Sequence, residues 1–490
     1  MFMLMIHRRS VSLFLLLFVP LFLYARGGHA PVYDVTAFGA VSDTTLLSTE
    51  AFQRAVDACA ADGGGTVWVP AGNYLCTTVI LKSNVNLHLD AGATVYASRK
   101  VSDYEGFRRK VGAADTGESE VLLGAFDAEN ISVTGTGTLH CRAERIGYRR
   151  KPQTAVTDSV TGREIANAAR YGADYQSKFR KVPPCPGAIS FVGCTGVCIR
   201  DIRVVESSFW SVHLQWCERV TVDGVYITSN RHNGVNADGL DIDGCSHVMV
   251  SNCRIDTGDD ALCLKTTRQG GKTLPCSQIT ITNCVLTSSS AALKIGTESH
   301  ADFENITVSN CVIDKANRGL NMIIRDGGSA RNILFSNIAI STCRKETFWW
   351  GNGDPVWFTV QKRGDGSSGT IENVTLSHII AHGQSGIRLE GFSRRIRNIR
   401  LNDVQLFMEP EDAVDKRSRN GFLFDGVDKL SLVDCEVNWN MQHPEPTWES
   451  AYLFRHVDGL QLVRTYGDCA PGSQYPAFRY EQVDHIRTTD

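Results

Sequence analysis

The sequence predicts an all-β protein, folded as a single-domain parallel β-helix. A short phrase of alternating apolar residues, a polar turn and a second apolar pair recurs from Ile131 to Leu430. The spacing from Ile279 to Ile306 is the same as from Ile306 to Ile333, and it varies around this value elsewhere, apart from two longer gaps, before Val197 and before Val374. The apolar residues alternate by two and are rich in β-branched types, which is typical of strands and not of helices. Repeats of this length with strand phrases indicate a solenoid of short strands joined by turns.

The segment from Met1 to Ala30 has the pattern of a secretory signal peptide. A basic His-Arg-Arg group precedes an apolar stretch from Val11 to Tyr24, and cleavage is expected close to Ala30. The alternative is an uncleaved membrane anchor, but the apolar run is short for one, and no later segment is apolar enough to cross a bilayer. We therefore expect residues 31–490 to form one secreted or periplasmic domain.

The next segment predicts a cap on the end of the solenoid. The phrases YDVTAFGA, GGGTVWVPAGNYL and LKSNVNLHLDAGATVY have the pattern of strands and tight turns, and Glu50–Ala61 predicts one amphipathic helix. Because the terminal repeats of a solenoid must be covered, this helix is expected to cover the open end.

Ten repeated phrases follow the cap. They begin at Ile131, Val197, Val220, Val248, Ile279, Ile306, Ile333, Val374, Ile399 and Leu430. Residues 142–181 and 344–369 interrupt the repeat and are expected to be long loops, the first of them a wall of a binding cleft. A β-sandwich or a propeller is the alternative architecture, but propeller blades usually need about forty residues and four strands.

Asparagine and cysteine occupy repeated positions within the phrases. Ladders of stacked amides are expected from Asn252, Asn283, Asn310 and Asn337. Free cysteine packs as a small apolar side chain, so an interior ladder of thiols is expected from Cys253, Cys284, Cys311 and Cys435. A disulfide elsewhere, for instance between Cys194 and Cys217, stays open. No cysteine or histidine cluster has the spacing of metal ligands.

The charge balance excludes one class of partner. The net charge is -3 and 21% of the residues are charged, without a basic stretch. The sequence therefore has no electrostatic footprint for nucleic acid, and partners must be argued from sites.

The run NADGLDIDGCSHVMVSNCRIDTGDDALCLK, residues 236–265, concentrates the acidic residues that point to chemistry. Asp238 and the pair Asp259–Asp260 are separated by about one coil of the predicted repeat. Since adjacent strands lie ~4.8 Å apart, the three carboxylates are expected to converge. Two or three converging carboxylates are the equipment of glycosidic bond hydrolysis, in which one acid protonates the leaving oxygen and another activates water. The alternative is that these aspartates are only turn residues.

These residues resemble the polygalacturonase family, glycoside hydrolase family 28. Asn236-Ala237-Asp238-Gly239 is similar to the family's Asn-Thr-Asp-Gly motif. Gly258-Asp259-Asp260 matches its Gly-Asp-Asp motif, and a matching Lys265 follows. The cap phrases and the stretch FWSVHLQWCERVTVDGV extend the resemblance over nearly all of the chain after Ala30.

The resemblance implies a right-handed parallel β-helix of the pectin-lyase-like type and a pectic substrate, without a metal or organic cofactor. It implies that Asp259 is the general acid, and that Asp238 and Asp260 hold and deprotonate the attacking water, with inversion at the anomeric carbon. Asn236 and Lys265 would then contact the substrate.

The sequence departs from the family pattern after the acidic pair. The family carries Gly-His-Gly about one coil later, and the stretch taken as its match is Gly296-Thr297-Glu298. His300 is a candidate to reach the place of the missing histidine, with a surface loop as its other reading. Glu298 is a candidate to bind a sugar hydroxyl, with an exposed turn as its other reading.

A second departure concerns the family's Arg-Ile-Lys phrase, whose cations resemble a clamp for the galacturonate carboxylate. Asn321 and Ile323 stand in the place of the two cations. Arg325 lies on the same strand face as Ile323 by alternation and could replace part of the clamp, or pair with Asp326. Retained acids with a lost clamp suggest a changed sugar.

The second insertion carries aromatic residues that could stack on sugar rings. Of Trp349, Trp350 and Trp357, Trp350 is the candidate for substrate contact, and one or two of the three are expected to anchor the loop. The pair Phe209–Trp210 is expected in the wall below the site.

The sequence thus predicts an exported inverting glycosidase acting on an α-linked, galacturonate-like residue of a pectic polysaccharide or oligosaccharide. One alternative keeps the fold and makes the protein a polysaccharide lyase, with Lys or Arg as base and the acidic cluster as a calcium site. The other is a glycan-binding β-helix without catalysis. Nothing in the sequence specifies an oligomeric state.

Overall fold

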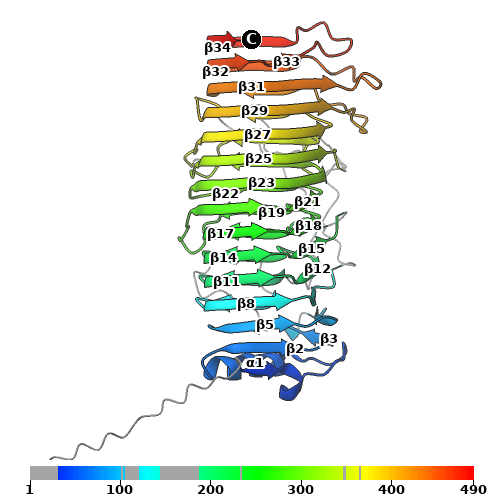
Figure 1. Ribbon diagram of the computed structural model, residues 1–490, viewed down its shortest axis with the longest axis vertical. Coiled ribbons are helices and arrows are strands. Elements are labelled where there is room, and N and C mark those ends of the chain that lie inside the picture. Colours follow the sequence, from blue (N-terminus) through cyan, green and yellow to red (C-terminus); the bar gives the residue numbers. More distant parts are fainter. Residues whose placement is uncertain are drawn as a thin grey trace, which may run out of the picture.

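The structure, a computed structural model, describes residues 31–100, 103–104, 121–143, 187–231, 234–345, 349–363 and 366–489. The chain is a right-handed parallel β-helix, as the repeat and the resemblance predicted, with its coils stacked along the long axis of the molecule (Figure 1). The predicted signal peptide and nearly all of the predicted loop 142–181 lie outside the described residues. No helix among the described residues is long and apolar enough to cross a membrane.

The strands form three stacks. The first stack carries the predicted phrases and consists of β1 (Val32–Asp34), β2 (Gly65–Val69), β5 (Val85–Leu89), β8 (Glu129–Gly135), β11 (Thr195–Arg200), β14 (Glu218–Asp223), β17 (Ser246–Ser251), β20 (Cys276–Thr282), β23 (Phe303–Ala316), β25 (Ala330–Thr342), β27 (Ile371–Gly383), β29 (Ile396–Met408), β31 (Val427–Trp439), β32 (Tyr452–Val463) and β34 (Phe478–Thr489).

The second stack is continued by the later parts of the long strands β23 to β31. It consists of β3 (Gly72–Cys76), β6 (Ala93–Ala97), β9 (Thr138–His140), β12 (Arg203–Ser207), β15 (Tyr226–Ser229), β18 (Arg254–Thr257), β21 (Val285–Ser288) and, beside β31, β33 (Tyr466–Gly467).

The third stack, called here the site stack, ends against β32. It consists of β4 (Val79–Ile80), β7 (Val121–Phe126), β10 (Gly187–Val192), β13 (Val212–Gln215), β16 (Leu240–Asp243), β19 (Leu262–Thr266), β22 (Ala291–Ser299), β24 (Arg318–Ile324), β26 (Asp354–Val360), β28 (Ile387–Glu390) and β30 (Phe422–Asp425).

The register of the first stack follows the sequence repeat. The first residues of all ten predicted phrases pair with one another in a single row from Ile131 to Leu430. Ile333 pairs with Val374 in this row, so the longer gap between these two phrases adds a loop and does not break the row. The alternating apolar residues point inward and form one continuous core.

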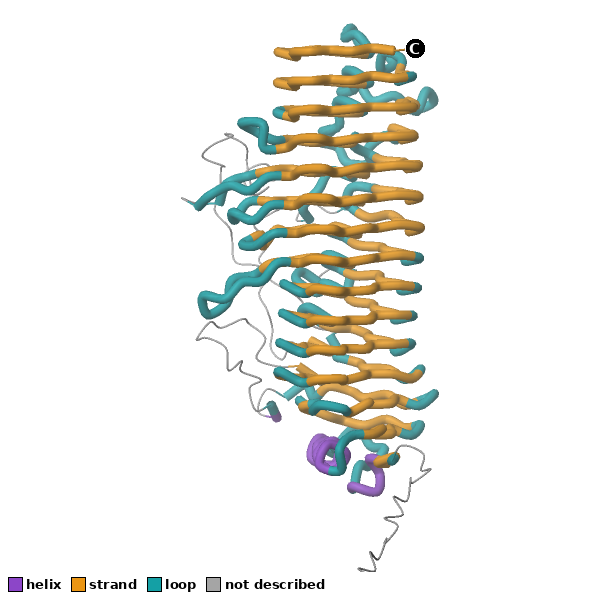
Figure 2. The backbone as a smooth tube through the Cα atoms, turned by 60° about the vertical axis from the view of Figure 1, so that its left-hand side comes forward, coloured by secondary structure: helices purple, strands orange, loops and turns teal. Residues whose placement is uncertain are grey.

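A helix covers one end of the solenoid, as predicted for residues 50–61. The helix is α1 (Thr49–Ala61), preceded by a 3-10 helix at Val35–Phe38, and it lies across the end of the strand stacks (Figure 2). It buries one face, on which Phe52 meets the ring of Tyr74 edge-on at 5.6 Å between centroids. Core apolar surface that the first coil would otherwise expose is thereby removed from water.

The asparagine ladder forms, with one interruption. All four predicted members are in the left-handed backbone region, which asparagine tolerates better than most residues. Asn337 donates to Asn310 at 3.2 Å and Asn283 donates to Asn252 at 3.5 Å, while Asn310 bonds the Thr282 hydroxyl instead. The sequence reasoning missed a second ladder, made of Asn305, Asn332, Asn373 and Asn398.

The cysteines of the predicted ladder are buried free thiols, as expected. The disulfide left open between Cys194 and Cys217 is not formed, because both are free. Each thiol instead donates to backbone carbonyls, Cys194 to Val192 at 3.5 Å and Cys217 to Phe191 at 3.4 Å.

Candidate active site

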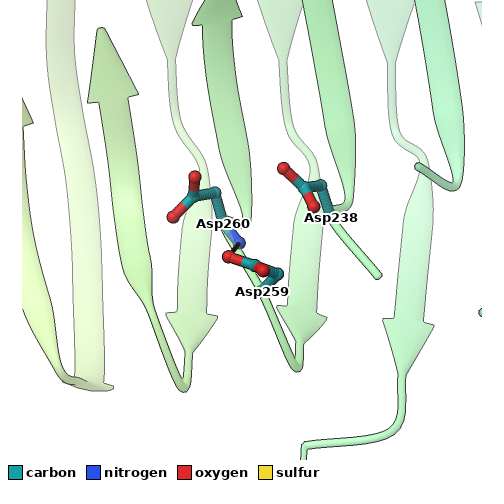
Figure 3. Close-up of side chains that lie close together, drawn as sticks. All are labelled: Asp238, Asp259 and Asp260. Atoms are coloured by element: carbon teal, nitrogen blue, oxygen red, sulfur yellow. Dashed lines mark hydrogen bonds between the residues drawn. The ribbon is translucent and has the colours of Figure 1, made fainter. Parts of the chain in front are cut away.

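Three carboxylates converge where two neighbouring strands of the site stack begin. Asp238 lies in the turn before β16, and Asp259 and Asp260 lie in the turn before β19 (Figure 3). The Gly239 amide donates to the Asp260 carbonyl at 2.9 Å, which brings the two turns side by side. One oxygen from each carboxylate lies within 4.8 Å of the other two, and all three side chains are buried. The predicted convergence is confirmed.

Backbone amides fix the carboxylate of Asp259. The Asn236 amide donates to Oδ2 at 2.8 Å, and the Asp260 amide donates to Oδ1 at 3.0 Å. Asn236 has a φ of 64°, a left-handed conformation that turns its amide towards Asp259. Its side chain is exposed. The described contact of Asn236 is therefore with the acid, and a substrate contact of its side chain stays a prediction.

Residues of the next two coils keep the Asp260 carboxyl ionised. Its Oδ1 accepts from the Ser290 hydroxyl at 2.8 Å and the Ala291 amide at 3.1 Å, and its Oδ2 lies 2.6 Å from the Lys294 ammonium. Arg318 lies 3.8 Å from Oδ1. Burial alone would raise the pKa of Asp260, but Lys294 and Arg318 outweigh it and lower the pKa well below the usual range.

Lys265 joins four groups of the site. Its Nζ lies 3.4 Å from Asp238, 3.5 Å from Asp241 and 3.6 Å from Glu298, and it lies 4.7 Å from the centre of the Trp210 ring. Burial alone would lower the pKa of Lys265, but Cys263 and then the carboxylates of Asp238, Asp241 and Glu298 raise the pKa well above the usual value. The lysine is therefore a permanent cation, and Trp210 forms a wall of the site as predicted.

Asp241 is a fourth acid that the sequence reasoning did not single out. It is fully buried on β16, and neither carboxylate oxygen has a hydrogen-bond partner among the described residues. Burial raises its pKa to about 7, although Lys265 and His213 oppose the shift. Burial, followed by the charge of Asp241, also raises the pKa of Asp238.

Burial and the neighbouring Asp260 raise the pKa of Asp259 as well. The pKa values of the three carboxyls are therefore shifted in different directions. Asp260 is a fixed anion, whereas Asp238, beside Asp241, and Asp259, beside Asp260, hold protons more tightly than ordinary carboxyls. A site with one protonated and one ionised carboxyl can both donate and accept a proton.

The structure corrects the match to the family's Gly-His-Gly. The residues that lie one coil after the acidic pair are Ser290 and Ala291, since the Ala261 amide donates to the Ala291 carbonyl at 2.9 Å. Glu298 lies instead near the far end of β22, because this strand runs from Ala291 to Ser299.

His300 does not reach the acids, because its Nε2 lies 3.9 Å from Asp326 beyond the end of β22. The described contact of the His300 side chain is therefore with Asp326, and a substrate contact stays a prediction. Glu298 does take part in the site through Lys265.

Two cations near Asp260 were missed by the sequence reasoning. Lys294 pairs in register with Asn321, the position of a lost family cation. The Arg318 guanidinium also donates to Asn321 Oδ1 at 3.0 Å. The alternation of the strand predicts that the Lys294 side chain faces outward, and this was the available signal. Its contact with Asp260 could not be predicted, because it depends on which strands are stacked beside each other.

The three tryptophans of the second insertion have different environments. Trp349 is buried against Val235, and Trp350 packs on the same cluster while partly exposed. Because Val235 precedes Asn236, Trp350 lies beside the turn that carries Asp238. Trp357 donates to Glu390 at 2.8 Å, and its ring lies 4.9 Å below the Arg388 guanidinium. Trp349 and Trp357 are therefore anchors, and a substrate contact of Trp350 stays a prediction.

The acids are also close enough to hold one metal ion, but their surroundings fit one poorly. Calcium takes about six to eight oxygen ligands, whereas both oxygens of Asp260 already accept bonds from protein donors. The ammonium groups of Lys265 and Lys294 also pair with Asp238 and Asp260, so the cluster already has counter-ions where a metal ion would lie.

A parallel β-helix with buried, differently tuned carboxylates on one outer face is a protein of the carbohydrate-cleaving class. The model of the glycosyl hydrolases family 28 matches residues 59–407, and the chain belongs to this family.

Named relatives fall within the same family. The chain is 26% identical over 259 residues to an exo-poly-alpha-D-galacturonosidase of Dickeya chrysanthemi, covering 47% of this chain and 41% of the relative. It is 27% identical over 254 residues to a polygalacturonase of Persea americana, covering 50% and 46%. The matched part therefore spans less than half of the length of these relatives.

Solved structures share the fold. The family 28 exopolygalacturonase of Yersinia enterocolitica superposes with a TM-score of 0.64 at 20% identity, over 94% of this chain and 78% of that one. A hyperthermoactive exopolygalacturonase of Thermotoga maritima gives a TM-score of 0.61 at 21% identity, over 84% and 92%.

Proposed function

We propose that this chain is an exported inverting glycosidase that cleaves an α-linked, galacturonate-like or related residue of a pectic polysaccharide or oligosaccharide. The observation that carries the proposal is the divergence of the three carboxyl pKa values, with Asp260 a fixed anion beside two acids of raised pKa. General acid and base catalysis needs such a pair of environments.

In the proposed reaction, Asp259 gives its proton to the glycosidic oxygen as the bond to the anomeric carbon breaks. Asp238 and Asp260 hold a water molecule on the other face of the sugar. The water oxygen bonds to the anomeric carbon and its proton passes to Asp238, which is a stronger base than the ion-paired Asp260. Lys265, at 3.4 Å, supports the ionised form of Asp238 before the reaction.

The carboxylate spacing and the family resemblance disagree on stereochemistry. One oxygen from each acid lies within 4.8 Å of the others, nearer to the ~5–5.5 Å of retaining sites than to the ~6.5–9.5 Å of inverting ones. We favour inversion because neither neighbour of Asp259 suits a nucleophile. Asp260 has both oxygens bonded to protein donors, and the raised pKa of Asp238 suits a base.

Two observations disfavour the alternative of a lyase. The base of a lyase would be a lysine or arginine of lowered pKa beside the acids, whereas the pKa of Lys265, which pairs with Asp238, is raised well above the usual value. Arg325, whose pKa is lowered to about 10, follows β24 at the other end of the site stack strands. The acids also fit calcium poorly. A hydrolase and a lyase remain separable by product, since only a lyase leaves an unsaturated sugar.

Product analysis tests the proposed function. Residues 31–490 incubated with pectic poly- and oligosaccharides are expected to release a saturated sugar, and proton NMR is expected to show the β-anomer first. Initial release of the α-anomer would overturn inversion, and an unsaturated product absorbing in the ultraviolet would overturn hydrolysis. Asp259→Asn is run in parallel to exclude contaminating activity.

A further inference from the structure

Cations from both sides of the site surround Glu298. Glu298, near the end of β22, lies 3.6 Å from Lys265 and 3.7 Å from Arg363. Burial alone would raise its pKa, but the cations lower the pKa of Glu298 to about 2. Those cations are Lys265, Lys294, Arg363 and Arg325.

Arg325 is the cation of this group without an ion-pair partner among the described residues. It follows β24, its Nε is buried, and that atom has no hydrogen-bond partner in the described part of the chain. The ion pair with Asp326 considered from the sequence does not form; Arg363 takes Asp326 instead, at 2.9 Å. A guanidinium with a buried, unpaired nitrogen is costly, and such a group in a site calls for an anionic ligand.

Arg363 completes an arrangement of two arginines. It belongs to the segment after β26, with 42% of its side chain exposed, and is oriented by Asp326 and Glu298. Its backbone amide donates to the Arg325 carbonyl at 3.1 Å, and its charge, after burial, contributes to lowering the pKa of Arg325 to about 10. Two guanidinium groups held close against their repulsion would gain from a shared carboxylate, which arginine binds through paired N–H groups.

The residues in place of the family's two cations are unsuited to this task. The Asn321 amide is occupied, since it accepts from Arg318 at 3.0 Å and donates to the Trp357 carbonyl at 2.9 Å. Ile323 is a buried apolar side chain. Recognition of a charged sugar therefore needs other residues.

We propose that Arg325 and Arg363 form a carboxylate-binding site for a uronate unit of the substrate, oriented by Glu298. This inference rests on the proposed function and names the chemistry of its substrate. Lys265 contacts both Asp238 and Glu298, so one side chain separates the acids from the carboxylate site. A sugar whose glycosidic oxygen meets Asp259 can then direct its carboxylate towards the arginines.

Kinetics on paired substrates test this site. Oligogalacturonides with free carboxylates are compared with their methyl esters, using Arg325→Gln and Arg363→Gln. Each variant is expected to lower kcat/KM on the free acids about 10- to 100-fold, mainly through KM, and to change kcat/KM on the esters less than about 3-fold. The matched control is Arg397→Gln on β29, whose arginine pairs with Glu372 at 2.8 Å on another stack; it should change neither substrate.

Stability separates recognition from a structural role. Because Arg325 has no ion-pair partner within the described ranges, Arg325→Gln is expected to keep or raise Tm while impairing turnover of the acids. Equal losses on acids and esters, or a lowered Tm with such losses, would overturn the carboxylate site. Wild-type protein that cleaves esters as well as acids would overturn it too.

Binding separates failure of this inference from failure of the proposed function. Calorimetry measures the affinity of Asp259→Asn for oligogalacturonides, with and without Arg325→Gln. If the wild type hydrolyses no pectic substrate but binding still depends on Arg325, the carboxylate site stands and the proposed function fails. If Arg325→Gln leaves the affinity unchanged, the carboxylate site is wrong.

Discussion

Asp259→Asn is expected to lower kcat on a pectic oligosaccharide by about 10²- to 10⁴-fold, the usual contribution of a general acid. Asparagine cannot give a proton to the leaving oxygen. KM is expected to change little, because asparagine keeps the shape of the side chain and one oxygen that accepts from the Asn236 or the Asp260 backbone amide. The other of these two hydrogen bonds is lost, since the asparagine NH2 group is a donor. Steady-state kinetics on the purified variant give both constants.

A change of leaving group identifies which carboxylate is the acid. An aryl glycoside with an activated leaving group needs no protonation, so Asp259→Asn is expected to lose less than about 10-fold on it. Asp238→Asn is expected to lose kcat strongly on both substrates, because the attacking water still needs a base. The opposite result, with the aryl substrate rescuing Asp238→Asn only, would exchange the two roles.

The matched control for these variants is Asp223→Asn. Asp223 is on β14 in the first stack, and its carboxylate accepts from Ser251 and Asn252. Asp223→Asn should lower the free energy of unfolding only slightly and leave kcat unchanged.

The fold could be predicted because the strand register of a solenoid appears as a repeat in the sequence. Each coil repeats the same local environment, so Ile279, Ile306 and Ile333 recur at one period and pair directly in the structure. The cap helix was readable from local periodicity in the same way, and it begins one residue before the predicted start. The ladder of Asn305 and Asn332 was missed because these asparagines precede the apolar phrase, where only the stacking reveals their common position.

The acids of the site could be predicted because they sit in turns one coil apart. Asp238 and Asp260 stand on neighbouring turns whatever the details of the strands between them. Lys294 and Asp241 could not be assigned in this way. Each is one outward residue of a strand, and whether it meets an acid depends on which strand lies beside it and how far its side chain reaches.

The remaining errors of the sequence-based prediction come from the length of one strand, β22. Glu298 and His300 follow Asp260 by 38 and 40 residues, more than the 30 residues to Ser290 one coil later, because β22 extends to Ser299 and ends at the opposite edge of the site stack. The same displacement puts Glu298 beside Arg363, a residue distant in sequence that only the fold brings close.

Lys265→Met is expected to have the largest effect on stability, a loss of about 3–5 kcal/mol at neutral pH, which is typical when one partner of a buried ion pair is removed. The ammonium group is the shared counter-ion of Asp238, Asp241 and Glu298. Methionine has a similar length, so the loss reports on charge more than on packing. Denaturant unfolding of the variant and the wild type measures the difference.

The loss in Lys265→Met should depend on pH. Burial already raises the folded-state pKa of Asp241 to about 7, above the ordinary value near ~4 in the unfolded chain, and removal of Lys265 raises it further. The folded variant then binds more protons than the unfolded chain, so its stability falls as pH rises from about 4 through 7 and beyond. The difference from the wild type should therefore be smaller at pH 5 than at pH 8.

Lys272→Met is the control, since Lys272 is an exposed residue that lies 4.1 Å from the Trp216 ring and in no carboxylate cluster of the described residues. It should cost less than about 1 kcal/mol at either pH. The free energies of unfolding of Lys265→Met and the wild type could instead differ by less than about 1 kcal/mol at pH 8, which is less than the loss of a buried ion pair should cost. In that case Asp238, Asp241 and Glu298 do not depend on this lysine. The ionised form of Asp238 would then need another source of support.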